Sequence, residues 1–259
     1  MARDIQITTS LTGRVALVTG SSRGIGAAIA ETFAAHGARV VLHGRDAGAL
    51  ESVRLRIAGD GGQVMTAVAD LTRFEEIEEM RMLIEQRFGA VDILVANAGG
   101  NPVPPGDIEL ISPEGWQASL DANLTSTFLT VKSFLPGMKS RGHGSIITLA
   151  SSASRRPTAH SPTAYAAAKA GVEVLTRQLA LQAGPFGVRV NGLAPGTILT
   201  ERNRDRIPAA VQEALAREHP AQRLGVPDDV AEAALFLASD AASWITGVIL
   251  DVAGGSVLA

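Results

Sequence analysis

Tyr165 lies four residues before Lys169 in an Ala-rich segment, and it is the only tyrosine of the chain. Positions four apart share one face of a helix, so the ammonium group of Lys169 would lie near the phenol. A free phenol has a pKa of about 10, and a neighbouring cation favours the phenolate. The pair is therefore a candidate general acid/base. A buried tyrosine with a chance lysine one turn later would be the better interpretation if the pair stood alone.

A second chemical feature is the glycine-rich segment from Thr19 to Gly26, which has the spacing Gly-x-x-x-Gly-x-Gly. Gly20 would allow a sharp turn from a strand into a helix. Gly24 and Gly26 lack the Cβ that would keep a pyrophosphate away from the helix N-terminus. The alternative is a tight turn that only packs a helix on a sheet. The position directly after the first predicted strand favours a dinucleotide.

The end of the second predicted strand indicates which dinucleotide would bind. An acidic residue there would accept a hydrogen bond from the ribose 2′-OH and repel a 2′-phosphate. The chain instead has Gly44 followed by Arg45, and Arg23 stands in the glycine-rich segment. The two guanidinium groups would bind a 2′-phosphate, which favours NADP(H) over NAD(H). Alternatively, Arg45 is a solvated loop residue and Arg23 serves only the packing of its own loop. Asp70, after the third strand, would hold the adenine amino group or cap a helix.

Short β-branched runs alternate with longer segments of helical periodicity along the whole chain. This alternation predicts an α/β fold, a doubly wound parallel sheet with helices on both faces. No linker or repeat divides residues 1–259, so we expect a single domain with a polar excursion near 200–225 beside the substrate. Strands are expected at 14–19, 39–43, 63–68, 91–96, 145–150, 188–193 and 248–252, and helices near 24–36, 47–58, 73–88, 114–139, 162–184 and 227–239.

Composition excludes several classes of function. The formal net charge is −3, and Lys and Arg are scattered, so nucleic acid is not an expected partner. The chain has no cysteine, which excludes disulfides and thiolate chemistry. None of the five histidines forms a metal-ligand pair at helical spacing, so we expect no metal. We find no apolar run long enough to span a bilayer and expect a cytoplasmic protein.

The chain closely resembles the classical short-chain dehydrogenases/reductases over essentially its whole length. It carries their motifs in order and at approximately their spacing: Thr19 to Gly26, Asn97-Ala98-Gly99, Ser151, Tyr165-x-x-x-Lys169 and Pro195-Gly196. The resemblance implies one Rossmann-type domain with a seven-stranded sheet. It also implies an oxidoreductase that interconverts a carbonyl and a secondary alcohol with NADP(H), or less favourably NAD(H).

The resemblance implies a role for each catalytic residue. Tyr165 would be the general acid/base, Lys169 would lower its pKa and hold the nicotinamide ribose, and Ser151 would hydrogen-bond the substrate oxygen. Asn123 would anchor water in a proton relay, or else cap a local kink in a helix. The cofactor contacts carried over from the family are Gly20, Ser22, Arg23, Gly24, Ile25, Gly26, Arg45, Asp70, Leu71, Asn97, Ala98, Gly99, Tyr165, Lys169, Pro195, Gly196, Ile198 and Thr200.

The sequence departs from the family in the spacing of its serine. Family members usually have the serine thirteen residues before the tyrosine, which points to Ser152. Alignment of the strand at 145–150 points to Ser151, and we choose it because the strand fixes which side chain leaves its end towards the cofactor. Arg155, Arg156 and His160 would suit an anionic substrate, although exposed loop charges are the preferred interpretation.

Within the family, the segment from Tyr165 to Gly171 is most similar to 3-oxoacyl-[acyl-carrier-protein] reductases. A small ketone, sugar or secondary alcohol is an equally good substrate class. The Ala-rich helix at 162–184 and the resemblance together suggest a homotetramer. Two other kinds of function remain as alternatives: a noncatalytic NADP(H) sensor, and an epimerase or dehydratase that returns its hydride to the substrate.

Overall fold

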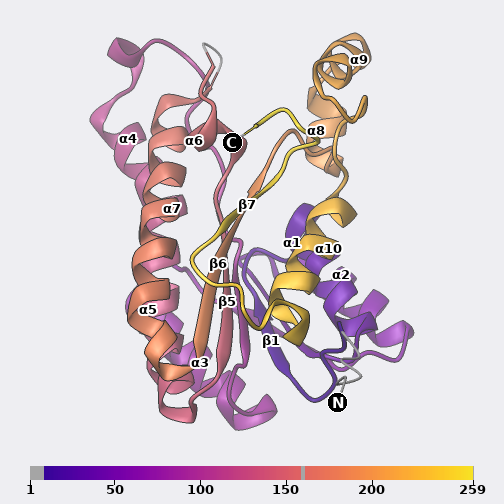
Figure 1. The fold of residues 1–259 in the computed structure, drawn as a ribbon, viewed down its shortest axis with the longest axis vertical. Helices are drawn as coiled ribbons and strands as arrows, with labels where there is room; N and C mark the ends of the chain where they lie inside the picture. Colours follow the sequence, from indigo (N-terminus) through magenta and orange to yellow (C-terminus); the bar gives the residue numbers. More distant parts are fainter. Residues whose placement is uncertain (1–8, 159–160, 259) are drawn as a thin grey trace, which may run out of the picture.

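A computed structural model describes residues 9–158 and 161–258. Over these residues, seven parallel strands form one sheet in the order β3-β2-β1-β4-β5-β6-β7 (Figure 1). The single doubly wound Rossmann-type sheet predicted from the sequence is confirmed. The strands are β1 (Val15–Val18), β2 (Arg39–Gly44), β3 (Val64–Val68), β4 (Ile93–Ala96), β5 (Gly144–Leu149), β6 (Val188–Pro195) and β7 (Ile249–Val252).

Helices cover both faces of the sheet (Figure 1). One face is covered by α1 (Gly24–Ala35), α2 (Ala47–Gly59) and α10 (Pro227–Ala238), and the other by α3 (Phe74–Phe88), α5 (Ser126–Arg141) and α7 (Thr163–Ala183). Because side chains alternate along a strand, neighbouring residues of β1 enter different cores. Ala16 and Val18 pack with Phe33 of α1. Leu17 packs with Met138 of α5 and Ile84 of α3. Each large apolar side chain buried in this way contributes about 1.5–3 kcal/mol.

The helix expected at 114–139 is in fact interrupted, which corrects the prediction. The structure has α4 (Pro113–Leu120), a π-helical turn (Asp121–Thr125) and then α5. Such turns are often found at functional sites. The polar excursion near 200–225 contains two helices that the periodicity did not predict, α8 (Glu201–Arg206) and α9 (Ala209–Glu218), and α6 (Ser152–Arg155) follows β5. Short 3₁₀ turns occupy Ile108–Leu110, Gly184–Phe186 and Asp240–Ala242.

The strand order reverses between β1 and β4, which are neighbours in the sheet although β2 and β3 separate them in the chain. In open α/β sheets the crevice at the carboxyl ends of the strands, at this reversal, is where ligands bind. The glycine-rich segment follows β1 and residues Asn97 to Gly99 follow β4, so both lie at this edge. Among the described residues, no helix is both long enough and apolar enough to cross a membrane.

Candidate active site

The turn after β1 is held by hydrogen bonds to Asn97 and Ala98, which follow β4. The buried hydroxyl of Thr19 accepts hydrogen bonds from the backbone N–H groups of Asn97 and Ala98, each at 3.0 Å. The side-chain amide of Asn97 donates to the carbonyls of Thr19, at 2.8 Å, and Gly20, at 3.1 Å. Asn97 therefore shapes the glycine-rich turn from the neighbouring strand end. The structure places Asn97 and Ala98 beside the predicted phosphate cradle.

Two of the three glycines are needed for close approach of the backbone. A Cβ on Gly26 would clash with the carbonyl of Gly20 and the amide of Asn97, and a Cβ on Gly20 would lie 2.9 Å from Ala98 Cα. Gly24 has a positive φ of +57°, and a Cβ there would lie 3.1 Å from a methyl carbon of Thr200. Glycine thus permits the loop after β1 to lie against the loop after β6.

The N-terminus of α1 suits a dinucleotide. Arg23 is the residue before the helix, and its side chain makes no capping hydrogen bond. The first N–H groups of a helix that lack such a cap, together with the helix dipole, favour an anion. Ser22 and Ile25, which were expected to contact the cofactor, flank this position and are partly exposed. The residues present therefore fit a pyrophosphate at the start of α1.

A histidine that sequence reasoning did not assign to the site supports the same turn. His43, in β2, is 3% exposed. Its Nδ1 accepts from Gly20 N at 3.3 Å, and its Nε2 lies 3.1 Å from the carbonyl of Ala69. The hydroxyl of Ser21 accepts from His43 N at 3.0 Å. Burial lowers the pKa of His43 from 6.5 to about 4. The neutral ring thus links β1, β2 and β3, and its only sequence signal is a histidine within an apolar strand.

Charged side chains gather at the end of β2, where the adenosine ribose was expected. Arg45 is exposed, and Arg23 forms an ion pair with Asp46 at 3.5 Å. The other oxygen of Asp46 accepts from Ala49 N at 3.1 Å and so caps α2. A Cβ on Gly44 would make only ordinary contacts, the nearest of them 3.4 Å from a methyl carbon of Leu50. The two arginines of the NADP(H) prediction therefore lie on adjacent loops.

Asp70 and Leu71 follow β3. One oxygen of Asp70 accepts from the N–H of Thr72 at 2.9 Å and from its hydroxyl at 2.8 Å. These hydrogen bonds lower the pKa of Asp70. The alternative role, a helix cap, is wrong, because Arg73 precedes α3 and Asp70 instead holds a local turn with Thr72. Contact of Asp70 with adenine stays a prediction. Leu71 is 6% exposed and packs in the core.

Three of the four predicted catalytic side chains, those of Ser151, Tyr165 and Lys169, meet where β5 ends. Ser151 precedes α6, and its hydroxyl accepts from Ala153 N at 3.2 Å. The hydroxyls of Ser151 and Tyr165 share a hydrogen bond. Lys169 is 4% exposed, and its Nζ donates to the carbonyl of Leu149 at 2.7 Å and lies 5.6 Å from the centre of the tyrosine ring. The hydrogen bond to Tyr165 thus comes from Ser151, the serine that we chose over its neighbour.

Burial sets the protonation of this group. Burial raises the pKa of Tyr165 above its usual value, and the hydrogen bond from Ser151 opposes that rise. Burial lowers the pKa of Lys169 to about 8. In the chain by itself the phenol is therefore protonated at neutral pH. The lowering of the Tyr165 pKa that we expect from Lys169 and an oxidised nicotinamide stays a prediction.

Asn123 is completely buried in the π-helical turn. Its amide nitrogen donates to the carbonyls of Gly100, at 2.8 Å, and Ser119, at 2.9 Å, and its amide oxygen accepts from Gly100 N at 3.1 Å. A Cβ on Gly99 would clash with this amide oxygen. Asn123 therefore fastens the loop after β4 to the interrupted helix. This is the local role given as its alternative, and a role in a proton relay stays a prediction.

The loop after β6 carries the last expected cofactor contacts. Gly196 N donates to the carbonyl of Val252 at 3.0 Å, next to Pro195 at the strand end. Ile198 is 4% exposed, and Thr200 caps α8 by accepting from Asn203 N at 3.3 Å. A cavity of about 240 Å³ opens at this edge, and Gly196, Ile198 and His219 are among its lining residues.

The arginines near the expected substrate side are engaged within the protein. Arg155 pairs with Glu173 at 3.4 Å and with Asp251 at 3.2 Å. Arg156 donates to the carbonyl of Ser256 at 2.9 Å. Arg155 is therefore not a solvated loop charge, whereas Arg156 is exposed, as the preferred interpretation expected. His160 lies outside the described residues.

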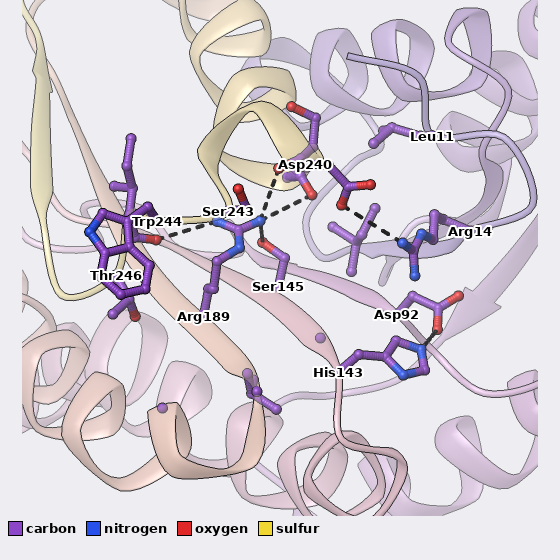
Figure 2. Close-up of a pocket in the computed structure, with 18 of the residues that line it drawn as sticks. Leu11, Arg14, Asp92, His143, Ser145, Arg189, Asp240, Ser243, Trp244 and Thr246 are labelled. Atoms are coloured by element: carbon purple, nitrogen blue, oxygen red, sulfur yellow. Dashed lines mark hydrogen bonds and ion pairs between the residues drawn. The ribbon is translucent and has the colours of Figure 1, made fainter. Parts of the chain in front are cut away.

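A larger cavity, about 450 Å³, lies at the opposite edge of the sheet (Figure 2). Its lining includes Asp92, Ser145 and Arg189, which lie at the amino ends of β4, β5 and β6. The guanidinium of Arg189 is occupied, because it donates to Ser145 Oγ at 3.3 Å and to carbonyls such as that of Ser239 at 3.2 Å. None of the predicted site residues lines this cavity, so it is separate from the candidate active site.

Comparisons with known proteins agree with this geometry. A family model described as enoyl-(acyl carrier protein) reductase matches residues 20–256. The 7α-hydroxysteroid dehydrogenase of Escherichia coli (strain K12) is 38% identical over 247 residues, 95% of each chain. A structure of 7α-hydroxysteroid dehydrogenase with NADH and 7-oxo glycochenodeoxycholic acid has a TM-score of 0.91 at 37% identity and covers 97% of both chains. A gluconate 5-dehydrogenase from Burkholderia cenocepacia J2315 with NADP and tartrate has a TM-score of 0.89 at 35% identity and covers 96% of both.

The fold and these likenesses define an oxidoreductase that uses a nicotinamide cofactor and acts on a hydroxyl or carbonyl group. The chain belongs to the classical short-chain dehydrogenase/reductase family, as its motifs indicated.

Proposed function

We propose that this chain interconverts a carbonyl and a secondary alcohol with NADP(H), and that Tyr165 is its general acid/base. The observation that carries the proposal is the group at the end of β5, where Tyr165 is hydrogen-bonded to Ser151 and lies above buried Lys169. The cofactor would supply or accept the hydride at the substrate carbon. The protein would supply orientation and the proton.

In the reductive direction, Ser151 and Tyr165 would both hydrogen-bond the carbonyl oxygen and polarise it. Tyr165 would then deliver its proton, and burial, which raises its pKa, keeps that proton in place at neutral pH. Lys169 would hold the nicotinamide ribose. A developing negative charge on the substrate oxygen is stabilised by such fixed donors more than the neutral carbonyl is.

The test follows absorbance of NADPH with a panel of β-ketoesters, diketones and sugars. We expect substrate-dependent loss of NADPH, and we expect Tyr165→Phe to lower kcat by about 10²–10⁴-fold because the general acid is gone. Binding of NADPH should persist in the variant. A folded Tyr165→Phe protein with near-normal turnover would refute the role. Tight cofactor binding without net turnover on the whole panel would favour the sensor or the hydride-returning enzymes instead.

We also propose that NADP(H) is preferred over NAD(H). Support comes from Arg23 and Arg45 near the end of β2 and from Gly44 in place of an acidic residue. The solved relatives named above hold NADH in one case and NADP in the other. Gly44→Asp should reverse the ratio of kcat/KM for NADPH and NADH, since the carboxylate would repel a 2′-phosphate. Gly44→Asn is the matched control, because it adds a side chain of the same size without charge. A ratio equally changed in both variants would reject the electrostatic explanation.

Three further parts of the proposal concern substrate, assembly and location. We propose that the segment 200–225 borders a substrate that is a small ketone, sugar or secondary alcohol, because Thr200 reaches the glycine-rich loop and His219 lines the nearby cavity.

We propose a homotetramer in the cytoplasm. Exposed apolar side chains on α7, Val174 at 64% and Leu181 at 74%, support a helix interface between copies. Sedimentation as a monomer at micromolar concentration would reject the assembly.

A further inference from the structure

We propose that Glu173 is a positioning residue for the reaction: it fixes the turn after β5 and thereby holds Ser151 against Tyr165. The inference rests on the proposed function, because it concerns the alignment of the proposed catalytic hydroxyls. Glu173 does not touch the reacting atoms. It acts through two residues of α6, Ser154 and Arg155.

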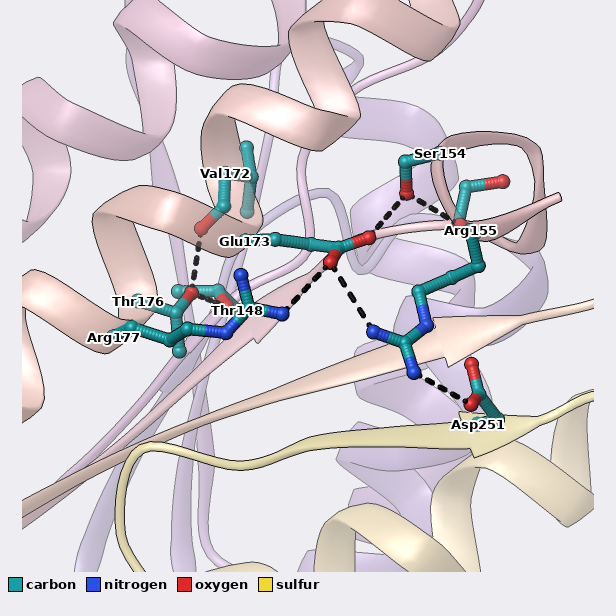
Figure 3. Close-up of polar contacts among 9 residues, drawn as sticks. Thr148, Ser154, Arg155, Val172, Glu173, Thr176, Arg177 and Asp251 are labelled. Atoms are coloured by element: carbon teal, nitrogen blue, oxygen red, sulfur yellow. Dashed lines mark hydrogen bonds and ion pairs between the residues drawn. The ribbon is translucent and has the colours of Figure 1, made fainter. Parts of the chain in front are cut away.

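Figure 3 shows how Glu173 contacts the two α6 residues Ser154 and Arg155. One oxygen of the Glu173 carboxylate accepts from Ser154 Oγ at 2.7 Å. The same hydroxyl lies 2.6 Å from the carbonyl of Ser151. Both oxygens are acceptors, so they share the single hydroxyl proton of Ser154, and this hydroxyl links Glu173 to the residue whose own hydroxyl bonds Tyr165. A short α6 of four residues has few internal hydrogen bonds to keep this turn in place.

The second oxygen of Glu173 binds two cations. Arg155, in α6, lies 3.4 Å away, and Arg177, one turn further along α7, lies 3.1 Å away. Arg155 also reaches Asp251 of β7 at 3.2 Å. These two carboxylates and two guanidinium groups balance in charge. The α6 turn is consequently held from α7 on one side and from β7 on the other.

Because these ion pairs are largely buried, removing one of the charged groups should lower the stability of the α6 turn. The Glu173 side chain is 9% exposed, and those of Arg155 and Asp251 are 21% and 19% exposed. Buried ionic groups are retained only where partners satisfy them, and removing one partner leaves the others unpaired. Hydrogen bonding to Asp251, and then its charge and that of Glu173, raise the pKa of Arg155, so the guanidinium stays charged.

The positions on α7 explain why this residue can reach the site. Tyr165, Lys169, Glu173 and Arg177 follow one another at intervals of four, which places them along one side of the helix. Tyr165 and Lys169 lie at the end of this row nearest the cofactor edge. Glu173 is the next residue in the row, and it faces the turn that carries Ser151.

The experiment compares Glu173→Ala and Glu173→Gln with Glu78→Ala as a matched control. Glu78 makes the same kinds of contact elsewhere, accepting from Ser133 at 2.5 Å and from Arg81 at 2.8 Å. Two quantities are measured in each variant: kcat and KM for the panel with NADPH, and the midpoint of phenolate absorbance in an alkaline titration. Because Tyr165 is the only tyrosine, this absorbance reports on it alone and needs neither substrate nor cofactor.

We expect Glu173→Ala to lower kcat by about 10- to 100-fold, since a misplacement of about 1 Å costs that much, while KM for NADPH stays roughly unchanged. The Tyr165 midpoint should move to higher pH, because the hydrogen bond from Ser151 that lowers its pKa is weakened. Glu173→Gln keeps an oxygen for Ser154 and should recover most of both properties. Glu78→Ala should change neither.

If Glu173→Ala matches Glu78→Ala in both kcat and phenol titration, the proposal is overturned. If Glu173→Ala does not fold, Ser154→Ala takes its place, since it removes the hydroxyl that links Glu173 to the Ser151 carbonyl and leaves the ion pairs of Glu173 intact. Unchanged values in that variant overturn the proposal equally. A titration shift in Glu173→Ala, with no turnover in the unaltered protein, would instead retain the positioning role and reject the proposed reaction.

Discussion

Lowering the pH from 8 to 5 should destabilise the protein through His43. The ring is 3% exposed, accepts at Nδ1 from Gly20 N, and faces the carbonyl of Ala69 with Nε2. A proton on Nδ1 would turn that acceptor into a donor pointing at another N–H. Burial is the largest cause of the lowered pKa, because it disfavours the charged ring.

The sign and size follow from the two pKa values. His43 titrates at about 4 when folded and at 6.5 in an unperturbed chain. The unfolded chain therefore binds more protons between these values, so stability is full above pH 6.5 and falls as the pH drops towards 4. Each unit corresponds to about 1.4 kcal/mol. The loss is about 2 kcal/mol at pH 5 and about 3 kcal/mol below pH 4.

The assay is urea unfolding followed by tryptophan fluorescence at pH 8 and pH 5, at one protein concentration because assembly contributes to stability. His43→Gln is the comparison, since glutamine keeps polar atoms in the pocket but does not titrate. The unaltered protein should lose about 2 kcal/mol more than the variant between the two pH values. Equal losses in the two proteins would refute the assignment to His43, whatever their absolute stabilities.

Two further predictions concern the backbone around the site. Gly26→Ala should lower the free energy of unfolding by about 1–3 kcal/mol, because its Cβ would clash with the Gly20 carbonyl, and thermal unfolding would check this. An unchanged melting temperature would contradict the close packing. Asn123→Ala should lower the free energy of unfolding by about 1–3 kcal/mol and speed amide exchange at Gly100, whose N–H would lose its partner. Unchanged exchange at Gly100 would contradict that link.

Local patterns predicted most of the fold. Strand and helix positions agree with the structure to within about two residues at nearly every expected element. The reason is that β-branched runs and helical periodicity are properties of neighbouring residues. The interrupted helix is an exception, because apolar periodicity continues through it. The interruption occurs where Asn123 bonds Gly100, 23 residues away in the chain. The helices α8 and α9 were not predicted either, and none of their residues is buried in the core.

Sequence spacing gave the candidate site. Tyr165 and Lys169 were proposed because residues four apart on a helix meet, and Gly20, Gly24 and Gly26 because a strand-to-helix turn has a known spacing. Glu173 lies on the same row of α7 as Tyr165 and Lys169, yet it carried no signal of its own. Its partners Ser154, 19 residues away, and Asp251 come from other elements.

The sequence by itself determined the parallel sheet, the glycine-rich turn after β1 and the tyrosine-lysine pair on one helix, since each depends on the order of nearby residues. Only the tertiary structure decided that Ser151 bonds Tyr165 and that His43 holds the glycine-rich turn. The same is true of the contacts of Glu173 and Asp251 with residues of α6. Those features depend on which strand ends and helix faces come together in space. Such contacts arise when the sheet and its covering helices are packed, and no spacing within one segment encodes them.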